Sequence, residues 1–90
     1  MEDEIAVYIE EAMNEVIGDM HLLEGARVTD VLPHPDADRY SIHIRKGDGQ
    51  YLFLHISPAE ALTESGGDDF KVAAFKKQIY RELKTHFPDL

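Results

Sequence analysis

The chain has 90 residues with a hydrophobic content of 43%, which suffices for one domain with one core and excludes a second domain. Without cysteine it cannot form disulfides or thiolate metal sites, and its formal net charge of −9 at pH 7 argues against non-specific attraction to nucleic acid or to an anionic membrane. Since it also lacks an apolar leader and a long apolar run, we expect a single cytoplasmic domain over residues 1–90, without a signal peptide or a membrane span.

An amphipathic helix is predicted at the start of the chain. Apolar residues recur there at three- and four-residue steps, and acidic residues fall on the opposite side. Glu2, Asp3 and Glu4 lie in or before the first turn, where the helix dipole favours negative charge, and Gly18 is expected to end the helix. The apolar stripe consists of Ile5, Ile9, Ala12, Met13, Val16 and Met20.

Three strands are predicted next. Gly25 precedes a first strand over residues 26–32, and residues 33–38 form a turn because two prolines cannot continue a ladder. Residues 40–45 and 51–56 then form a hairpin around a three-residue loop, Gly47-Asp48-Gly49, in which Gly49 supplies the positive φ of a G1 bulge.

The register of this hairpin follows from the alternation of side chains, because a one-residue slip would move every aliphatic group to the other face. A two-residue turn at Asp48-Gly49 would set Ile44 against Phe53, so burial favours the longer loop. The predicted register pairs Ile44 with Leu52, Ile42 with Leu54 and Tyr40 with Ile56 on an aliphatic face, and Arg45 with Tyr51, His43 with Phe53 and Ser41 with His55 on the other.

A short helical turn is predicted after the hairpin. Ser57 at the cap, Pro58 at the first helical position and Glu60 three residues after the cap make a capping-box arrangement. Residues 63–67 are expected to form a flexible link to the last helix.

The last predicted helix is capped by Asp68 or Asp69 and ends before Pro88. Its buried stripe is Val72, Phe75, Ile79, Leu83 and Phe87, and its basic face is Lys76, Lys77, Arg81 and Lys84. The predicted fold class is therefore α+β: a three-stranded antiparallel meander with the N-terminal and C-terminal helices packed on its one aliphatic face.

The two long helices are opposite in charge. The first 24 residues contain eight acids and no Lys or Arg, whereas five of the nine basic residues lie between Lys71 and Lys84. Three interpretations are open: electrostatic complementarity between neighbouring helices, a basic binding strip made of Lys76, Lys77, Arg81 and Lys84, and head-to-tail contacts between molecules.

The α-β-β-β-α order, ending in residues 70–77 with the sequence Phe-Lys-Val-Ala-Ala-Phe-Lys-Lys, resembles a double-stranded-RNA-binding domain. The resemblance implies that lysines at the start of the last helix grip phosphates. The chain departs from the family there, because Asp68 and Asp69 stand where phosphates would approach and the family's serine-lysine-lysine start has no match.

A second resemblance covers Val28 to Arg39, whose His34-Pro35-Asp36-Ala37-Asp38-Arg39 looks like the strand-turn signature of tRNA-binding OB-fold domains related to those appended to aminoacyl-tRNA synthetases. It implies a tRNA-binding barrel. The downstream sequence instead predicts a helix where a five-stranded barrel needs further strands, and a Pro-Asp-rich turn also arises for conformational reasons.

The histidines are the candidate metal or catalytic residues. His43 and His55 are diagonal neighbours on one sheet face, but a zinc site needs three or four ligands, while His21, His34 and His86 fall at the ends of elements. Nucleophilic catalysis lacks a cysteine and a Ser/His/acid set. We expect no cofactor, no metal and no catalytic residue, with a small enzyme using His43 and His55 as one alternative.

The sequence therefore predicts a non-enzymatic interaction module. Its candidate interaction surface is the uncovered sheet face, which contacts a protein partner or a second copy of the chain. Binding of RNA through that face or through the last helix is the alternative, although the net charge makes a nucleic acid partner unfavourable. The surface consists of His43, Arg45, Tyr51, Phe53 and His55.

Overall fold

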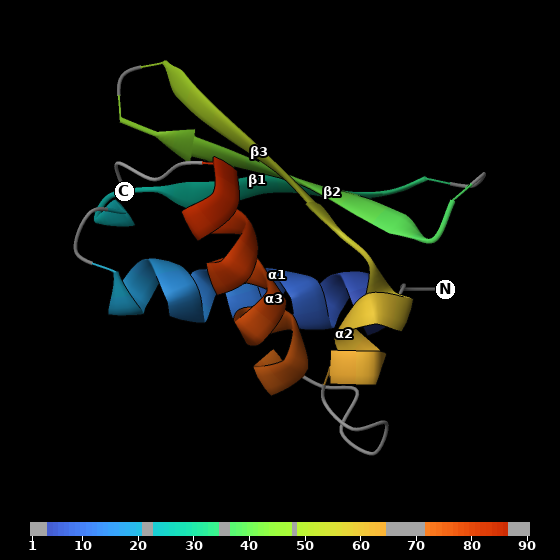
Figure 1. The fold of residues 1–90 in the computed structure, drawn as a ribbon. Coiled ribbons are helices and arrows are strands. Elements are labelled where there is room, and N and C mark those ends of the chain that lie inside the picture. The colour runs from blue at the N-terminus through green and yellow to red at the C-terminus, as the bar shows by residue number, and fades with distance from the viewer. Residues whose placement is uncertain (1–3, 21–22, 35–36, 48, 65–71, 87–90) are drawn as a thin grey trace.

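The fold is α+β, as predicted, with three antiparallel strands in the order β1-β2-β3 between an N-terminal and a C-terminal helix. The structure, a computed structural model, describes residues 4–20, 23–34, 37–47, 49–64 and 72–86. Its elements are α1 (Glu4–Asp19), β1 (Arg27–His34), β2 (Arg39–Lys46), β3 (Gln50–Ile56), α2 (Pro58–Glu64) and α3 (Val72–His86). Figure 1 shows α1 and α3 on the same side of the sheet, while no described element covers the other side.

The hairpin of β2 and β3 has the predicted register in every pair, from Tyr40 opposite Ile56 to Arg45 opposite Tyr51. Lys46 and Gln50 close the loop. Gly49 has the predicted positive φ of 83°, and Gly47 also has a positive φ, of 64°. Asp48 lies outside the described residues. Burial of one aliphatic face therefore decides the register, against the preference of the Asp-Gly dipeptide for a two-residue turn.

Strand β1 is longer than predicted. It runs to His34, and Pro33 pairs with Tyr40, so the prediction that a turn begins at Pro33 was wrong. The reason is that β1 is an edge strand, where a proline is tolerated because only one side of the backbone has a hydrogen-bonding neighbour. A bulge between Val28 and Asp30 interrupts the pairing with β2, and the Thr29 hydroxyl there donates a 3.1 Å hydrogen bond to the carbonyl of His43.

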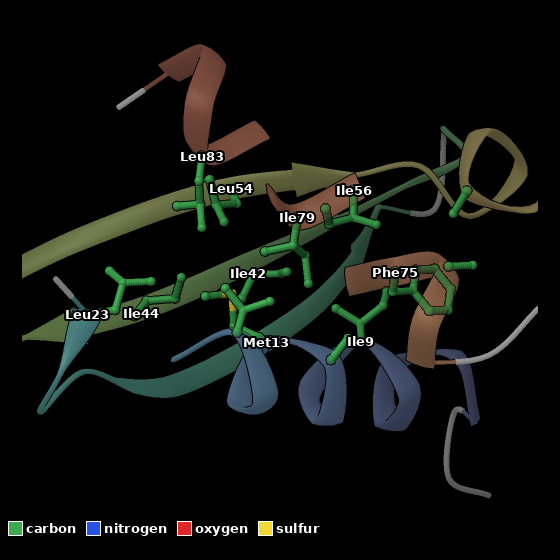
Figure 2. Close-up of a cluster of buried hydrophobic side chains, with 14 residues drawn as sticks. Ile9, Met13, Leu23, Ile42, Ile44, Leu54, Ile56, Phe75, Ile79 and Leu83 are labelled. Atoms are coloured by element: carbon green, nitrogen blue, oxygen red, sulfur yellow. The ribbon is translucent and has the colours of Figure 1, made fainter. Parts of the chain in front are cut away.

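The core lies between the sheet and the two long helices, as Figure 2 shows. The predicted aliphatic face of the hairpin supplies four buried side chains, and the predicted stripes of α1 and α3 meet it. Ile5 and Met20 lie at the margin of the core, and Gly18 lies within α1, which ends one residue later. Phe87 lies outside the described residues. The fully buried large side chains include Ile9, Met13, Leu23, Ile42, Ile44, Leu54, Ile56, Phe75, Ile79 and Leu83.

Helix α2 extends through Thr63 to Glu64, so the prediction that the link begins at Thr63 was wrong. The Thr63 hydroxyl donates to the carbonyl of Ala59 at 3.0 Å, four residues earlier, as a helical residue can. The predicted caps of α3, Asp68 and Asp69, lie outside the described residues.

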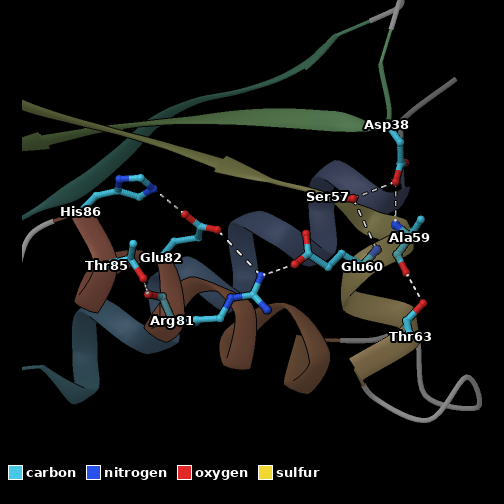
Figure 3. A network of polar contacts seen from close by, with 9 residues as sticks. All are labelled: Asp38, Ser57, Ala59, Glu60, Thr63, Arg81, Glu82, Thr85 and His86. Atoms are coloured by element: carbon cyan, nitrogen blue, oxygen red, sulfur yellow. Dashed lines mark hydrogen bonds and ion pairs between the residues drawn. The ribbon is translucent and has the colours of Figure 1, made fainter.

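The start of α2 is capped by two side chains, one of them distant in sequence (Figure 3). The Ser57 hydroxyl accepts a 3.4 Å hydrogen bond from the N–H of Glu60, which is one half of the predicted capping box. The Asp38 carboxylate accepts 2.9 Å hydrogen bonds from the Ala59 N–H and from the Ser57 hydroxyl. The Glu60 carboxylate accepts from Arg81 at 2.8 Å rather than reaching back to Ser57.

Candidate interaction surface

The sheet face turned away from α1 and α3 is called the open face. Directly opposed residues of neighbouring strands point to the same face, so the register given above assigns the side chains to it. The structure places all five predicted surface residues there and adds residues of β1. The open face consists of Arg27, Asp30, Leu32 and His34 of β1, Arg39, Ser41, His43 and Arg45 of β2, and Tyr51, Phe53 and His55 of β3.

Large apolar side chains gather on the open face. In the described part of the chain, four large hydrophobic side chains are exposed, and three of them lie here: Leu32, Tyr51 and Phe53, at 46%, 53% and 57% exposure. The Phe53 ring packs edge-on against His43 with ring centroids 4.9 Å apart, and lies nearly parallel to the Tyr51 ring at 6.4 Å. The rings form a continuous aromatic strip of the kind that dominates the energetics of interfaces.

A second group on this face joins all three strands. The Nε2 atom of His34 is hydrogen-bonded to the hydroxyl of Ser41, and the His34 ring meets the His55 ring edge-on with centroids 6.0 Å apart. Ser41 is buried beneath them. His34 was not among the predicted surface residues, because the turn expected at Pro33 removed it from the sheet. Tolerance of proline in an edge strand is the signal that could have found it.

This serine and histidine pair does not make a nucleophilic triad in the described residues. Asp38, an acid near this pair in sequence, accepts its hydrogen bonds from the start of α2. No group of three or more His, Cys, Asp or Glu side chains is placed to hold a metal ion within the ranges that the structure describes. Within the described residues, His34, Ser41 and His55 form a polar contact group.

The open face is locally basic although the chain is acidic. Its charged side chains are three arginines and one aspartate, against a net charge of −9 for the whole chain. Arg27 and Arg45 are directly opposed, and like charges in this position repel. Both line a shallow hollow together with Gly25 and Gly47. Groups of opposite charge on a binding partner would relieve this repulsion.

The predicted basic strip of α3 is divided between ion pairs and exposed side chains. Lys76 contacts Asp19 at 2.9 Å and Glu15 at 3.6 Å, both on α1. Arg81 contacts Glu60 of α2 at 2.8 Å and Glu82 at 3.8 Å, and His86 contacts Glu82 at 2.9 Å (Figure 3). Lys77 and Lys84 are exposed. Complementarity between helices thus accounts for two of the four predicted strip residues.

The contact between α1 and α3 perturbs three acid-base groups. The hydrogen bond and the charge of Lys76 lower the pKa of the Asp19 carboxyl below its ordinary value, and the same hydrogen bond raises the pKa of Lys76. Desolvation raises the pKa of Tyr80, with the charge of Asp19 adding to it, and the Tyr80 hydroxyl donates to Asp19 at 3.3 Å. Ionised Asp19 therefore helps to join the two helices, together with Glu15, which also contacts Lys76.

Replacing Asp19 with asparagine is expected to reduce the loss in the free energy of unfolding that occurs as the pH becomes acidic. Because folding lowers this pKa, the stabilisation is complete above the ordinary value of 3.8 and is lost as pH falls through the lower folded value. Urea unfolding of the wild type and of Asp19→Asn, at neutral pH and at about pH 3, measures the difference. Glu11→Gln, at an exposed site on α1, is the control. Equal acid-side losses in all three proteins would contradict the assignment.

No protein-family model, curated protein or solved structure matches the chain. None of the helices in the described ranges is long and apolar enough to cross a membrane.

Proposed function

We propose that this domain is a non-enzymatic interaction module whose open face contacts a protein partner or a second copy of the chain. One observation carries the proposal: three of the four large hydrophobic side chains that are exposed in the described residues lie on a single sheet face. Large apolar and aromatic side chains exposed on one face among polar groups are typical of a surface that becomes buried on association.

The composition of the open face also favours a protein partner. Tyrosine, phenylalanine and arginine are enriched at protein interfaces, and all three occur here. The Phe53 ring is already held by His43 and Tyr51. Binding would therefore cost little loss of side-chain freedom at this position.

Replacing Phe53 with serine tests the proposal. Since Phe53 is 57% exposed, its loss is expected to lower the free energy of unfolding by less than about 1 kcal/mol while weakening self-association or capture of a partner. Thermal unfolding, sedimentation velocity and quantitative co-purification are compared for the two proteins. Val7→Ser, at an exposed apolar site on α1, is the matched control and is expected to associate as the wild type does.

Two results would contradict this reading of Phe53. A loss of several kcal/mol in the isolated monomer would assign the ring to a core. Unchanged association in Phe53→Ser, with the same affinity as in the Val7→Ser control, would remove the open face from the interface.

Binding of single-stranded RNA by the open face is the alternative function, because stacked rings and arginines on one sheet suit unpaired bases and phosphates. Double-stranded RNA is a poorer fit, since Lys76 and Arg81 on α3 already contact carboxylates. A single-stranded oligonucleotide that binds the wild type but not Arg45→Gln, with an affinity that falls as salt rises, would favour this alternative.

For double-stranded RNA we expect no measurable affinity at physiological salt, given the net charge of −9. Fluorescence anisotropy of a labelled duplex over a salt titration provides the measurement. Tight binding that disappears in Lys76→Glu and Lys77→Glu would contradict this expectation and would point to α3 as the binding element.

A further inference from the structure

The two edges of the sheet differ in how they are protected against another strand. The β1 edge has a bulge at Thr29, a proline at position 33 and the charged residues Arg27 and Asp30. These are the devices that prevent edge-to-edge pairing in soluble sheet proteins. The β3 edge has none of them: its sequence Gln-Tyr-Leu-Phe-Leu-His-Ile contains no proline and no Lys, Arg, Asp or Glu, and its pairing with β2 is uninterrupted.

We propose that β3 pairs, antiparallel and about a two-fold axis, with β3 of a second copy, so that one continuous sheet runs through both chains. This inference rests on the proposed function and deepens it by naming the partner and the contact. In Figure 1 none of the described strands lies beside β3 on the side away from β2. An unpaired strand edge offers its backbone N–H and C=O groups to such a partner.

Residues at equal distances on either side of the centre of β3 suit one another as cross-strand neighbours. Phe53 is the central residue of the strand, so a symmetric pairing sets it against Phe53 of the second copy. The same register sets Leu52 against Leu54 and Tyr51 against His55. The two residues of each pair are separated by an even number of positions in the sequence. The leucines therefore stay on the face covered by helices, and the aromatic residues stay on the open face. Opposed aromatic and apolar pairs of this kind stabilise antiparallel strands.

Charge favours this strand as the place where two copies meet. Two chains that each carry a net charge of −9 repel one another, and the repulsion is smallest where the touching surfaces bear no carboxylate. The only titratable groups of β3 are those of Tyr51 and His55. Leu52, which is only partly buried in the single chain, would gain burial against the added strand.

The absence of cysteine from the chain allows a direct test with single-cysteine variants. In the proposed register, the two copies of position 53 face each other across the two-fold axis, within the distance at which a disulfide forms. The two copies of position 51 are four residues apart along the strand, about 13 Å, which exceeds the limit of about 7 Å between Cα atoms. Tyr51→Cys is thus a matched control on the same strand and the same face, with similar exposure.

The full-length Phe53→Cys and Tyr51→Cys variants are equilibrated in a glutathione redox buffer and analysed by non-reducing electrophoresis and intact mass. We expect roughly tenfold more disulfide-linked dimer from Phe53→Cys than from Tyr51→Cys, because only the former meets the disulfide geometry. A mixture of Tyr51→Cys and His55→Cys chains is expected to form the mixed dimer. The wild type is expected to sediment as a dimer at the protein concentration used for crosslinking.

Three outcomes would overturn the pairing: a wild type that stays monomeric, equal crosslinking at positions 51 and 53, or equal crosslinking by Leu32→Cys on β1. The last would indicate that the two sheets stack face to face. If the wild type is monomeric but Phe53→Ser still weakens capture of a different protein, the pairing is wrong and the proposed function stands. If neither self-association nor capture responds to Phe53→Ser, the proposed function is wrong as well.

Discussion

Replacing Leu54 with alanine is expected to lower the free energy of unfolding by about 2–5 kcal/mol, as truncations of buried leucines do. Leu54 is 1% exposed and lies on the sheet face that receives the helices, beside Leu83 of α3 in Figure 2. The variant would leave a cavity between β3 and α3. Urea unfolding followed by circular dichroism gives the difference.

Leu52→Ala is the matched control for this measurement, because Leu52 lies on the same strand and the same face but is only partly buried. The free energy of unfolding is expected to fall less in Leu52→Ala than in Leu54→Ala. A loss below about 1 kcal/mol at position 54 would show that the helices do not pack on this face.

Replacing Gln78 with methionine is expected to raise the free energy of unfolding by about 1–3 kcal/mol. Gln78 of α3 is 1% exposed, and its Oε1 atom has no hydrogen-bond partner among the described residues. A buried acceptor without a partner costs free energy, and methionine fills a similar volume without a polar group. Thermal and urea unfolding of the two proteins measure the gain.

Gln78→Glu is the contrasting variant, since it places an ionisable carboxyl at the same site and is expected to destabilise the fold, increasingly as pH rises. A loss of stability in Gln78→Met would show instead that the amide is hydrogen-bonded in solution and belongs to a polar network of the core.

The hairpin could be predicted from sequence because its information is local. The side chains of β2 and β3 alternate between aliphatic and polar or aromatic, and only one register keeps the buried residues together. The same alternation placed His43, Arg45, Tyr51, Phe53 and His55 on one face. That part of the candidate surface therefore followed from the pattern.

The β1 part of the surface could not be predicted in this way. Strict alternation from Val28 would turn Asp30 toward the helices, but the extra residue at Thr29 shifts the alternation so that Val31 faces the core. A bulge of this kind leaves no clear mark in the sequence. The placement of His34 depended likewise on β1 being an edge strand, which is a property of the whole sheet.

The cap that Asp38 provides has a consequence for the order of events in folding. The Ala59 N–H and the Asp38 carboxylate are 21 residues apart in sequence. A helix as short as α2 is unstable in isolation. It gains this bond only after β2 and β3 have paired, because that pairing brings Asp38 beside Ser57 and Ala59. Formation of α2 therefore depends on a contact between residues that are distant in sequence, and such contacts form slowly. We therefore expect α2 to form after the β2–β3 hairpin.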